Sequence, residues 1–196
     1  IIQRIRAFVK RSEPNRALAD VAVLVSNAME LAEIELRRHH VRLIHYIAAR
    51  LPDLIVDRIL IEQVLINLMK NAAESIAQAN RPTASRNVEL RVVPKQLNEQ
   101  SVVEFSVLDS GQGLSPEVME RLFEAFYSTK TEGMGIGLKL CRSIVESHQG
   151  RLEAVNIYNG DEVVGCRFTF WIPVIPPLSP AASAPDSIAT EGADLH

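Results

Sequence analysis

The chain has 196 residues, 47% of them hydrophobic, and a formal net charge of −3. It is long enough to bury the core of one domain, and no Lys/Arg run is long enough to predict a nucleic-acid-binding surface. No apolar stretch approaches the roughly 20 residues of a membrane-spanning helix, and no signal peptide is apparent. We therefore expect a cytoplasmic location without membrane contact for this stretch of sequence.

Both ends of the chain differ from its middle. At the start, Ile1, Ile5 and Phe8 recur at helical spacing, and the helix that they predict has no N-cap. We expect residues 1–19 to be the end of a longer helix and a linker, although a short helix packed on the domain would show the same pattern. Residues 174–196 are rich in Pro, Ala and Ser without periodicity, which predicts a disordered tail.

Two long helices are predicted in the first half of the chain. Asp20 can cap the first, which runs to about Arg38. The second covers about Val56–Ala79 and can be capped by Asp53 or Asp57. Apolar residues recur along one side of each helix, so both are expected to pack on a core.

A row of polar residues runs along the second of these helices. Asn67 and Asn71 are four residues apart and project the same way, with Lys70 adjacent. Asparagine is a poor helix former, so two of them within an apolar helix need a reason. Two interpretations are equally supported: amides that bond to backbone or face water, or an amide oxygen that binds Mg²⁺ beside a phosphate chain.

The other predicted elements are mostly strands. A helix is also expected from Ile136 to His148, ended by Gly150 at its C′ position. Pro94–Gln100 is predicted to be a hairpin loop, and a turn is expected around Gly160. The five expected strands are Val41–Ile47, Val88–Val93, Val102–Leu108, Arg151–Ile157 and Gly165–Ile172.

The most informative stretch runs from Asp109 to Gly137, and it contains five of the nine glycines. Glycine lets a ligand approach the backbone closely, and the helix start at Gly137 offers N–H groups that suit phosphate. Asp109 lies at a strand end, where it could accept a hydrogen bond from the amino group of a base, and Lys130 could reach a phosphate. A single G-x-G-x-G turn would be weak evidence, but the ordered set is more specific.

The cysteines and histidines of the chain do not predict a metal site. Cys141 and Cys166 lack the spacing of a metal site and are expected to be buried thiols. His39 and His40 stand at a helix end, where cations suit the dipole, and no partner residues stand at metal spacing.

Four motifs in order resemble the ATP-binding catalytic domain of sensor histidine kinases, within the wider group of DNA gyrase B, Hsp90 and MutL. Q-V-L-I-N-L-M-K-N-A resembles the N box, D-S-G-Q-G-L the G1 box, L-F-E-A-F the F box and E-G-M-G-I-G-L the G2 box. The resemblance covers residues 20–173. Y-S-T-K and the short lid resemble the oxygen- and dicarboxylate-sensing branch. The implied fold is an α/β (α+β) two-layer sandwich of Bergerat type, with a mixed, mostly antiparallel sheet covered by helices on one face.

The resemblance also implies a site for ATP and Mg²⁺. Asn71 would bind the Mg²⁺ that bridges the phosphates, with Asn67 and Lys70 near them. Asp109 would bond the adenine amino group. Gly111 and Gly113 would shape the floor of the site, and Phe123 and Phe126 would hinge and anchor the lid. The lid and its phosphate contacts are expected to comprise Thr129, Lys130, Gly133, Gly135, Ile136, Gly137 and Leu138.

The resemblance has two departures that bear on activity. None of the five histidines has the setting of the family's phosphoacceptor, so we identify no catalytic residue here and expect the chain to be inactive in cis. The acceptor would lie on a missing dimerisation domain, whose last helix would end within residues 1–11. Asn67 stands where hydrolytic relatives have a glutamate that activates water, and an amide is not a base.

These departures favour one function among three. The favoured function is a protein-histidine kinase domain that acts in a homodimer, passes phosphate to a response regulator and belongs to a full-length protein that can be anchored in the inner membrane. The alternatives are a hydrolytic ATPase clamp, against which Asn67 argues, and a nucleotide-sensing module without transfer.

Overall fold

The computed structural model describes residues 14–79, 82–124 and 137–175. Its elements in chain order are β1 (Ala17–Ala19), α2 (Val21–Arg38), β2 (Arg42–Ile47), β3 (Leu54–Val56), α3 (Arg58–Gln78), the 3₁₀ helix η1 (Thr83–Ser85), β4 (Asn87–Leu97), β5 (Gln100–Asp109), α4 (Pro116–Arg121), α5 (Gly137–Ser147), β6 (Arg151–Asn159) and β7 (Glu162–Pro173).

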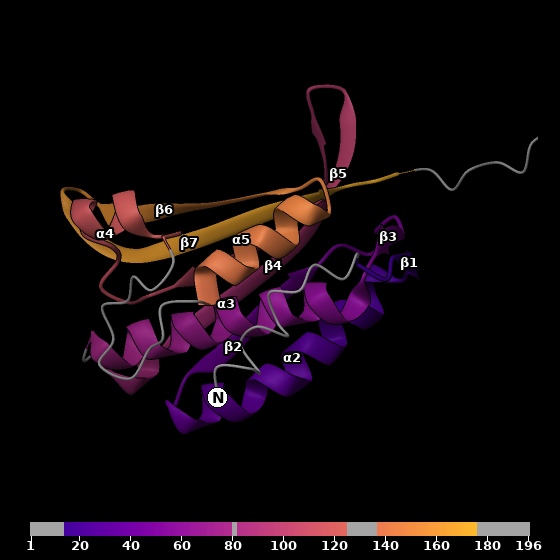
Figure 1. Ribbon diagram of the computed structural model, residues 1–196. Coiled ribbons are helices and arrows are strands. Elements are labelled where there is room, and N and C mark those ends of the chain that lie inside the picture. The colour runs from indigo at the N-terminus through magenta and orange to yellow at the C-terminus, as the bar shows by residue number, and fades with distance from the viewer. Residues whose placement is uncertain (1–13, 80–81, 125–136, 176–196) are drawn as a thin grey trace, which may run out of the picture.

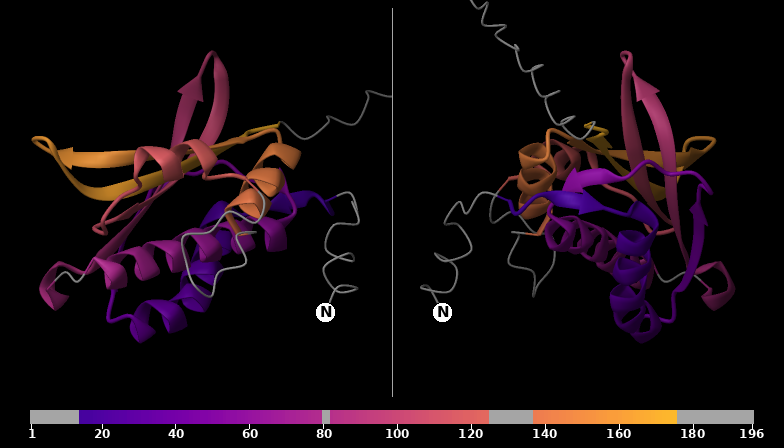
Figure 2. Two further views of the ribbon diagram at one scale, coloured as in Figure 1. Left: turned by 60° about the vertical axis from the view of Figure 1, so that its left-hand side comes forward. Right: turned by 90° about the vertical axis from the view of Figure 1, so that its right-hand side faces the viewer.

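The main sheet has five strands in the order β2-β4-β5-β7-β6. The β2–β4 pair is parallel, and the other three pairs are antiparallel. Helices α2, α3 and α5 cover one face of this sheet, whereas β1 and β3 form a separate pair beside the starts of α2 and α3 (Figures 1 and 2). The predicted two-layer sandwich with a mixed, mostly antiparallel sheet is therefore confirmed.

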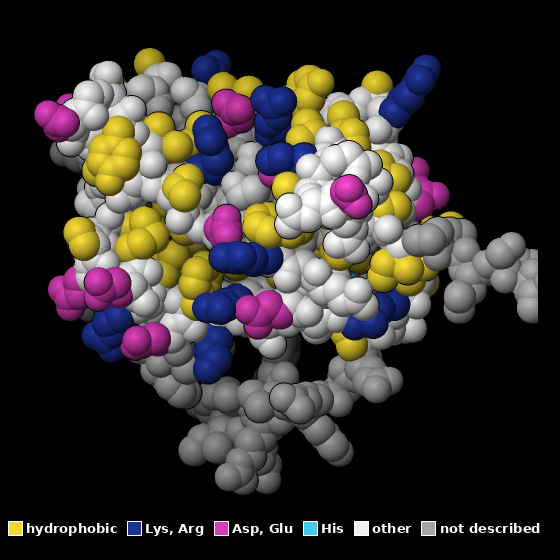
Figure 3. All heavy atoms as spheres, turned by 90° about the horizontal axis from the view of Figure 1, so that it is seen from above, with side chains coloured by type: hydrophobic (Ala, Val, Ile, Leu, Met, Phe, Trp, Pro, Cys, Tyr) yellow, Lys and Arg dark blue, Asp and Glu magenta, His cyan; other side chains and the backbone are white. Residues whose placement is uncertain are grey.

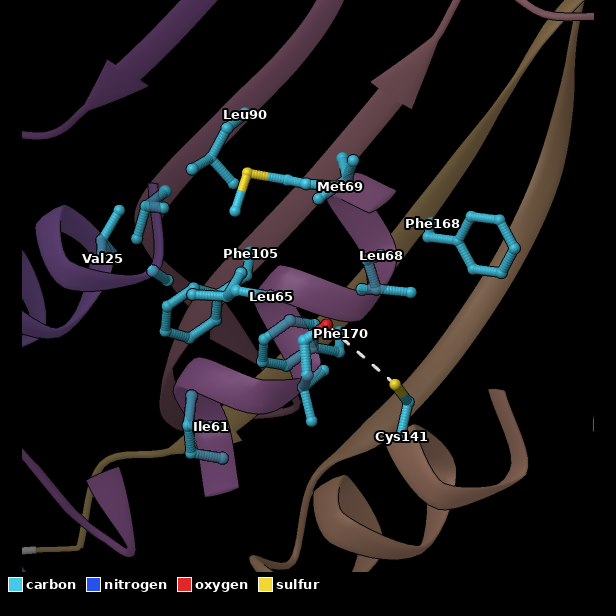
Figure 4. Packing of buried hydrophobic residues seen from close by; sticks show 14 of the residues in the cluster. Val25, Ile61, Leu65, Leu68, Met69, Leu90, Phe105, Cys141, Phe168 and Phe170 are labelled. Carbon is cyan, nitrogen blue, oxygen red and sulfur yellow. Dashed lines mark hydrogen bonds between the residues drawn. The ribbon is translucent and has the colours of Figure 1, made fainter. Parts of the chain in front are cut away.

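The core lies between the sheet and the helices. Strand residues alternate between the two faces, so Phe105 of β5 and Phe170 of β7 both point inward. Their rings stack with centroids 4.6 Å apart and an interplanar angle of 6°. Leu65 and Leu68 of α3 belong to the same core cluster (Figure 4), and all four side chains are fully buried. Burial of each such side chain contributes about 1.5–3 kcal/mol to folding.

Both long helices begin at the predicted caps. Asp20 Oδ1 accepts the Val23 N–H at 3.0 Å, and Asp57 Oδ1 accepts the Leu60 N–H at 3.3 Å. Each bond satisfies a backbone donor that the first turn leaves without a partner. Of the two caps considered for α3, the structure uses Asp57, because β3 occupies the residues that follow Asp53.

The predicted hairpin between β4 and β5 is present, but its loop is shorter than predicted. The strands run to Leu97 and start again at Gln100, with Asn98 and Glu99 forming a tight turn at φ 47° and 68°. Pro94 is tolerated inside β4 because it lies beyond Val92, where the pairing with β2 ends. The hairpin therefore projects beyond the rest of the sheet (Figure 1).

The end of α5 also differs from the prediction by one residue. Gln149, not Gly150, takes the left-handed conformation, with φ 62°, and its N–H bonds Glu146 O at 3.0 Å. The Gly150 N–H bonds Val145 O at 2.9 Å, which completes a Schellman motif with glycine at C″. Glycine is needed there because an added Cβ would lie 2.1 Å from Trp171 O.

The short elements β1, β3 and α4 were not predicted, since three to six residues carry too little periodicity. Within the described ranges, none of the helices combines the length and the hydropathy that crossing a bilayer requires.

Candidate nucleotide-binding site

A polar row on α3 joins two of the sequence motifs. Asn67, Asn71 and Ser75 follow one another at four-residue spacing, so they lie on one side of the helix, and the row spans about 12 Å at 1.5 Å per residue. At one end, Ser75 Oγ donates to Asp109 Oδ1 at 3.4 Å. At the other end, a Cβ added at Gly137 would lie 2.8 Å from Asn67 Nδ2. The fold therefore brings the first glycine motif and the second against opposite ends of the same row.

Asp109 is a buried carboxylate at the end of β5. The residue is only 4% exposed, and its Oδ1 accepts the Gly111 N–H at 2.8 Å. Burial raises the pKa of Asp109 from 3.8 to about 6, although bonds from the Gly111 and Cys166 backbones and from Ser75 oppose the shift. Asp109 is therefore mostly ionised at neutral pH, and such a buried, perturbed acceptor is typical of a binding site.

The loop after Asp109 packs so tightly that two positions require glycine. A Cβ at Gly111 would lie 2.1 Å from Ser75 Oγ and 2.7 Å from Asp109 Oδ1, so a side chain there would displace both groups. Gly113 has φ 72°, and its Cβ would lie 2.2 Å from Val163 Cγ1. The backbone is thus held close to the carboxylate.

Asn156 of β6, which was not predicted as a site residue, fixes the far side of this loop. Its Oδ1 accepts the Leu114 N–H at 2.9 Å, and its Nδ2 donates to Leu114 O at 2.7 Å. Gly165 of β7 was also missed as a site residue, although a Cβ there would lie 2.0 Å from Asp109 O. The one available signal was an asparagine inside a predicted strand, where asparagine is depleted.

At the other end of the row, Cys141 of α5 holds the Asn67 amide. Asn67 Nδ2 donates to Cys141 Sγ at 3.0 Å, and the thiol approaches Val64 O at 4.0 Å (Figure 4). Burial raises the pKa of Cys141 to about 11, so the thiol stays protonated. Cys141 and Cys166 are both buried and free, as predicted. Neither Asn67 nor the neutral Cys141 can act as a base at neutral pH.

The remaining predicted residues divide into two groups. Lys70 is exposed, with Nζ 4.0 Å from Glu74 Oε1, whereas Asn71 and Leu138 are partly buried. The second group lies outside the described residues, and its roles stay predictions: Phe126, Thr129, Lys130, Gly133, Gly135 and Ile136.

The described residues suit a Mg²⁺ ion that is held partly by substrate phosphates better than a metal ion that is held only by protein side chains. Among them there is no cluster of three or more His, Cys, Asp or Glu side chains that could hold a metal ion. The α3 row offers amide groups instead, from Asn67 and Asn71. Mg²⁺ keeps several waters and is usually held by substrate phosphates with one or two protein oxygens, which this donor set fits.

The open face of the sheet carries a concavity of about 700 Å³, but its chemistry differs. Charges of both signs line it, and some already pair, such as Lys95 Nζ with Glu104 Oε2 at 2.6 Å. Figure 3 shows Lys and Arg side chains interspersed with Asp, Glu and hydrophobic side chains on the described surface seen from above. This face has neither a glycine-lined loop nor a buried charge among its described residues, so we place the candidate site at the α3 row.

Comparisons with known proteins identify the family of the chain. Residues 56–176 match the family described as histidine kinase-, DNA gyrase B- and HSP90-like ATPases. The chain is 38% identical over 181 residues to the C4-dicarboxylate transport sensor protein DctS of Rhodobacter capsulatus, covering 92% of this chain and 26% of that protein. It is 35% identical over 173 residues to the sensor protein FixL of Bradyrhizobium diazoefficiens, covering 88% of this chain and 32% of that protein. The chain therefore spans about a quarter to a third of these relatives.

Solved structures share the fold. Full-length ShkA in complex with AMPPNP superposes with a TM-score of 0.65 at 25% identity, over 83% of this chain and 32% of that one. The catalytic domain of the histidine kinase ThkA superposes with a TM-score of 0.63 at 28% identity, over 81% of this chain and 95% of that one. The match to ThkA covers nearly all of a domain described as catalytic.

Proposed function

Because the chain belongs to the family of histidine kinase-, DNA gyrase B- and HSP90-like ATPases, we propose that residues 20–173 form the ATP-binding catalytic domain of a sensor histidine kinase. Residues 1–19 would then end a dimerisation helix and link it to this domain, and residues 174–196 would be a tail. Similarity to sensor proteins along 88–92% of the chain supports this proposal. The observation that carries it is the α3 row, which places Asp109 and Gly137 at its two ends.

Asp109 recognises the adenine end of ATP. Its carboxylate lies at the base of a glycine loop that holds the backbone close, so a planar base can approach it. The exocyclic amino group donates to the ionised carboxylate, and a charge-assisted bond of this kind contributes about 1.5–3 kcal/mol. Ser75 and Gly111 orient the carboxylate by donating to Oδ1.

Asn67, Asn71 and the start of α5 hold the phosphate end. The first backbone N–H groups of α5 and its positive dipole end suit the phosphate oxygens, and Lys130 is proposed to add a point charge. The oxygen of Asn71 would hold Mg²⁺ against the phosphates. Bound there, Mg²⁺ would supply charge neutralisation during phosphoryl transfer.

The chain positions ATP for transfer to a histidine rather than to water. In the transfer, the bond between the γ-phosphorus and the bridging oxygen breaks, a bond to an imidazole nitrogen forms, and ADP leaves. A general base contributes about 10²–10⁴-fold to a reaction of water, and Asn67 cannot serve as one. The acceptor is proposed to lie on the dimerisation domain, from which phosphate passes to an aspartate of a response regulator.

Calorimetric binding of a non-hydrolysable ATP analogue tests this function. The parent should bind the analogue, Asp109→Asn should lose that binding, and Asn71→Ala should lose its Mg²⁺ dependence. Asp161→Asn, an exposed turn residue, is the matched control and should bind like the parent. Absence of binding in the parent at millimolar analogue would contradict the proposal.

A second measurement separates a kinase from a nucleotide-sensing module. Labelled ATP is incubated with the chain and a supplied dimerisation domain of a related sensor kinase. Transfer of label to the histidine of that domain supports the kinase, whereas binding without any transfer favours the sensing module. Sustained release of free phosphate by the chain alone would instead favour a hydrolytic clamp.

A further inference from the structure

The segment that enters the domain is hydrogen-bonded to the ends of two helices. The Asn15 N–H donates to Asp57 Oδ2 at 2.9 Å, at the start of α3. The Arg16 guanidinium donates to Ser147 O, the last residue of α5. Residues 15 and 16 therefore bridge α3 and α5 before the chain pairs in β1.

Asp57 serves both the segment and α3. While Oδ2 accepts from Asn15, Oδ1 caps α3 by accepting the Leu60 N–H at 3.3 Å. One carboxylate thus holds the entering backbone and the first turn of the helix together. If the segment changes its position, either Asp57 moves with it or the bond between Asn15 and Asp57 breaks.

His148 joins the same two helices from inside. It is 3% exposed, and its Nε2 accepts the Asp57 N–H at 3.0 Å. Its Nδ1 lies 2.8 Å from Ile144 O, so the proton of the neutral ring is on Nδ1, donating to α5. Desolvation lowers the pKa of His148, with a smaller contribution from Arg16, and this keeps the ring in the neutral form that both bonds need. We call Asp57, Ser147 and His148, which receive or join these contacts, the α3–α5 junction.

The position of Arg16 suits the end of α5 electrostatically. The last carbonyls of a helix have no intrahelical partner and carry its negative dipole end. The described last turn of α5 contains no basic residue of its own. Arg16, which lies outside the helix, places a positive charge at this end through its bond to Ser147 O.

The other end of α5 lies at the nucleotide site. Gly137 packs on Asn67, and Cys141, one turn later, accepts from the Asn67 amide. The 11 residues of α5 are about 16 Å long, and Ile144 and Val145 are buried against the core. The helix therefore connects the contact at Ser147 with the packing of Gly137 on Asn67.

From this geometry we propose that the α3–α5 junction is a docking site for the entering segment, with Arg16 as its main contact, and that docking and nucleotide binding favour each other through α5. The second part rests on the proposed nucleotide function. By reciprocity, a nucleotide that orders the start of α5 strengthens the contact of Arg16 with its end, and loss of that contact weakens the nucleotide. The segment is thereby a means by which whatever precedes it in the chain affects the site.

Arg16→Ala in the whole chain tests the coupling. We expect the affinity for a non-hydrolysable ATP analogue, measured by calorimetry, to fall about fivefold or more. Arg16→Lys keeps the charge and should recover part of the loss. Arg167→Ala removes an exposed arginine from β7 on the open face of the sheet and should leave the affinity unchanged.

The reverse direction is read from the backbone amide resonances of Asn15 and Asp57 in a nitrogen-15 NMR spectrum. The analogue should shift both in the parent, although neither residue belongs to the nucleotide site, and shift them much less in Arg16→Ala. The coupling would be overturned, and the nucleotide function would stand, if two results were found together. These are an unchanged affinity in Arg16→Ala and unshifted resonances in a parent that binds the analogue.

If the parent binds no analogue, the nucleotide function fails and the coupling fails with it. The docking part is still decided, because Arg16→Ala should shift the Asp57 resonance, which is far from Arg16 in sequence, without any nucleotide. No such shift would show that Arg16 does not hold the segment.

Discussion

Strand β5 carries two acidic side chains that lie on opposite faces of the sheet and have opposite environments. Glu104 faces the open side, where its side chain is 20% exposed and pairs with Lys95 at 2.6 Å. Asp109 faces the helices, is 4% exposed, and accepts from Gly111 and Ser75. Burial and backbone geometry, rather than charge or hollow shape, therefore distinguish the candidate site on this sheet.

The largest difference between the two faces should appear in the core. Phe105→Ala removes a fully buried ring that stacks on Phe170, so it should lower the free energy of unfolding by about 3–5 kcal/mol. The adjacent Glu104→Ala on the open face should cost less than about 1 kcal/mol. Urea denaturation followed by circular dichroism measures both values, and similar losses would mean that the open face is covered in solution.

Asp109 should lower the stability of the fold increasingly as the pH rises. Its folded pKa of about 6 exceeds 3.8, so its contribution to stability is fully present below pH 3.8 and is lost as the pH rises through 6. The loss is about 3 kcal/mol at 1.36 kcal/mol per pKa unit. Asp109→Asn should therefore raise the free energy of unfolding at pH 8 by up to this amount, while nucleotide affinity falls.

The measurement is urea denaturation of the parent and Asp109→Asn at pH 4, 6 and 8. The advantage of the variant should shrink toward pH 4, where the parent carboxyl is protonated. A difference between Asp109→Asn and the parent that is constant with pH would contradict the burial argument.

A smaller effect should distinguish the two helix caps. Asp20→Ala removes one cap bond from α2 and should cost about 1 kcal/mol. Asp57→Ala removes the cap of α3 and the bond to Asn15, so the loss of stability should be larger, about 2 kcal/mol. Thermal unfolding compares them, and equal losses would indicate that Asn15 contributes nothing.

The smallest effect is expected at the ion pair on the open face. Lys95→Gln should lower stability by about 0.2–1 kcal/mol, because Lys95 is 47% exposed and solvent screens the pair. The loss should shrink further in 1 M salt, where the Debye length is about 3 Å. Denaturation in low and high salt checks this, and a loss that grows with salt would contradict it.

Several features of the fold follow from short stretches of sequence. Alternation over Val102–Leu108 predicts a strand with one buried face because side chains alternate along a strand, and Val103, Phe105 and Val107 are indeed buried. The caps Asp20 and Asp57 were predictable because a cap bonds a backbone group three residues away. The boundaries near Pro94 and Gly150 were not, since the end of β2 and the position of Trp171 decide them.

For the candidate site, residue types and motif order were sufficient to select Asn67, Asp109 and Gly137, because the chemistry of each motif is local. How these residues are held depends on partners far away along the chain: Ser75 is 34 residues from Asp109, Asn156 is 42 from Leu114, and Cys141 is 74 from Asn67. No local pattern encodes such pairs. Burial is likewise a property of the packed fold. It raises the pKa of Asp109 and, with a smaller contribution from Arg16, keeps His148 neutral between α3 and α5.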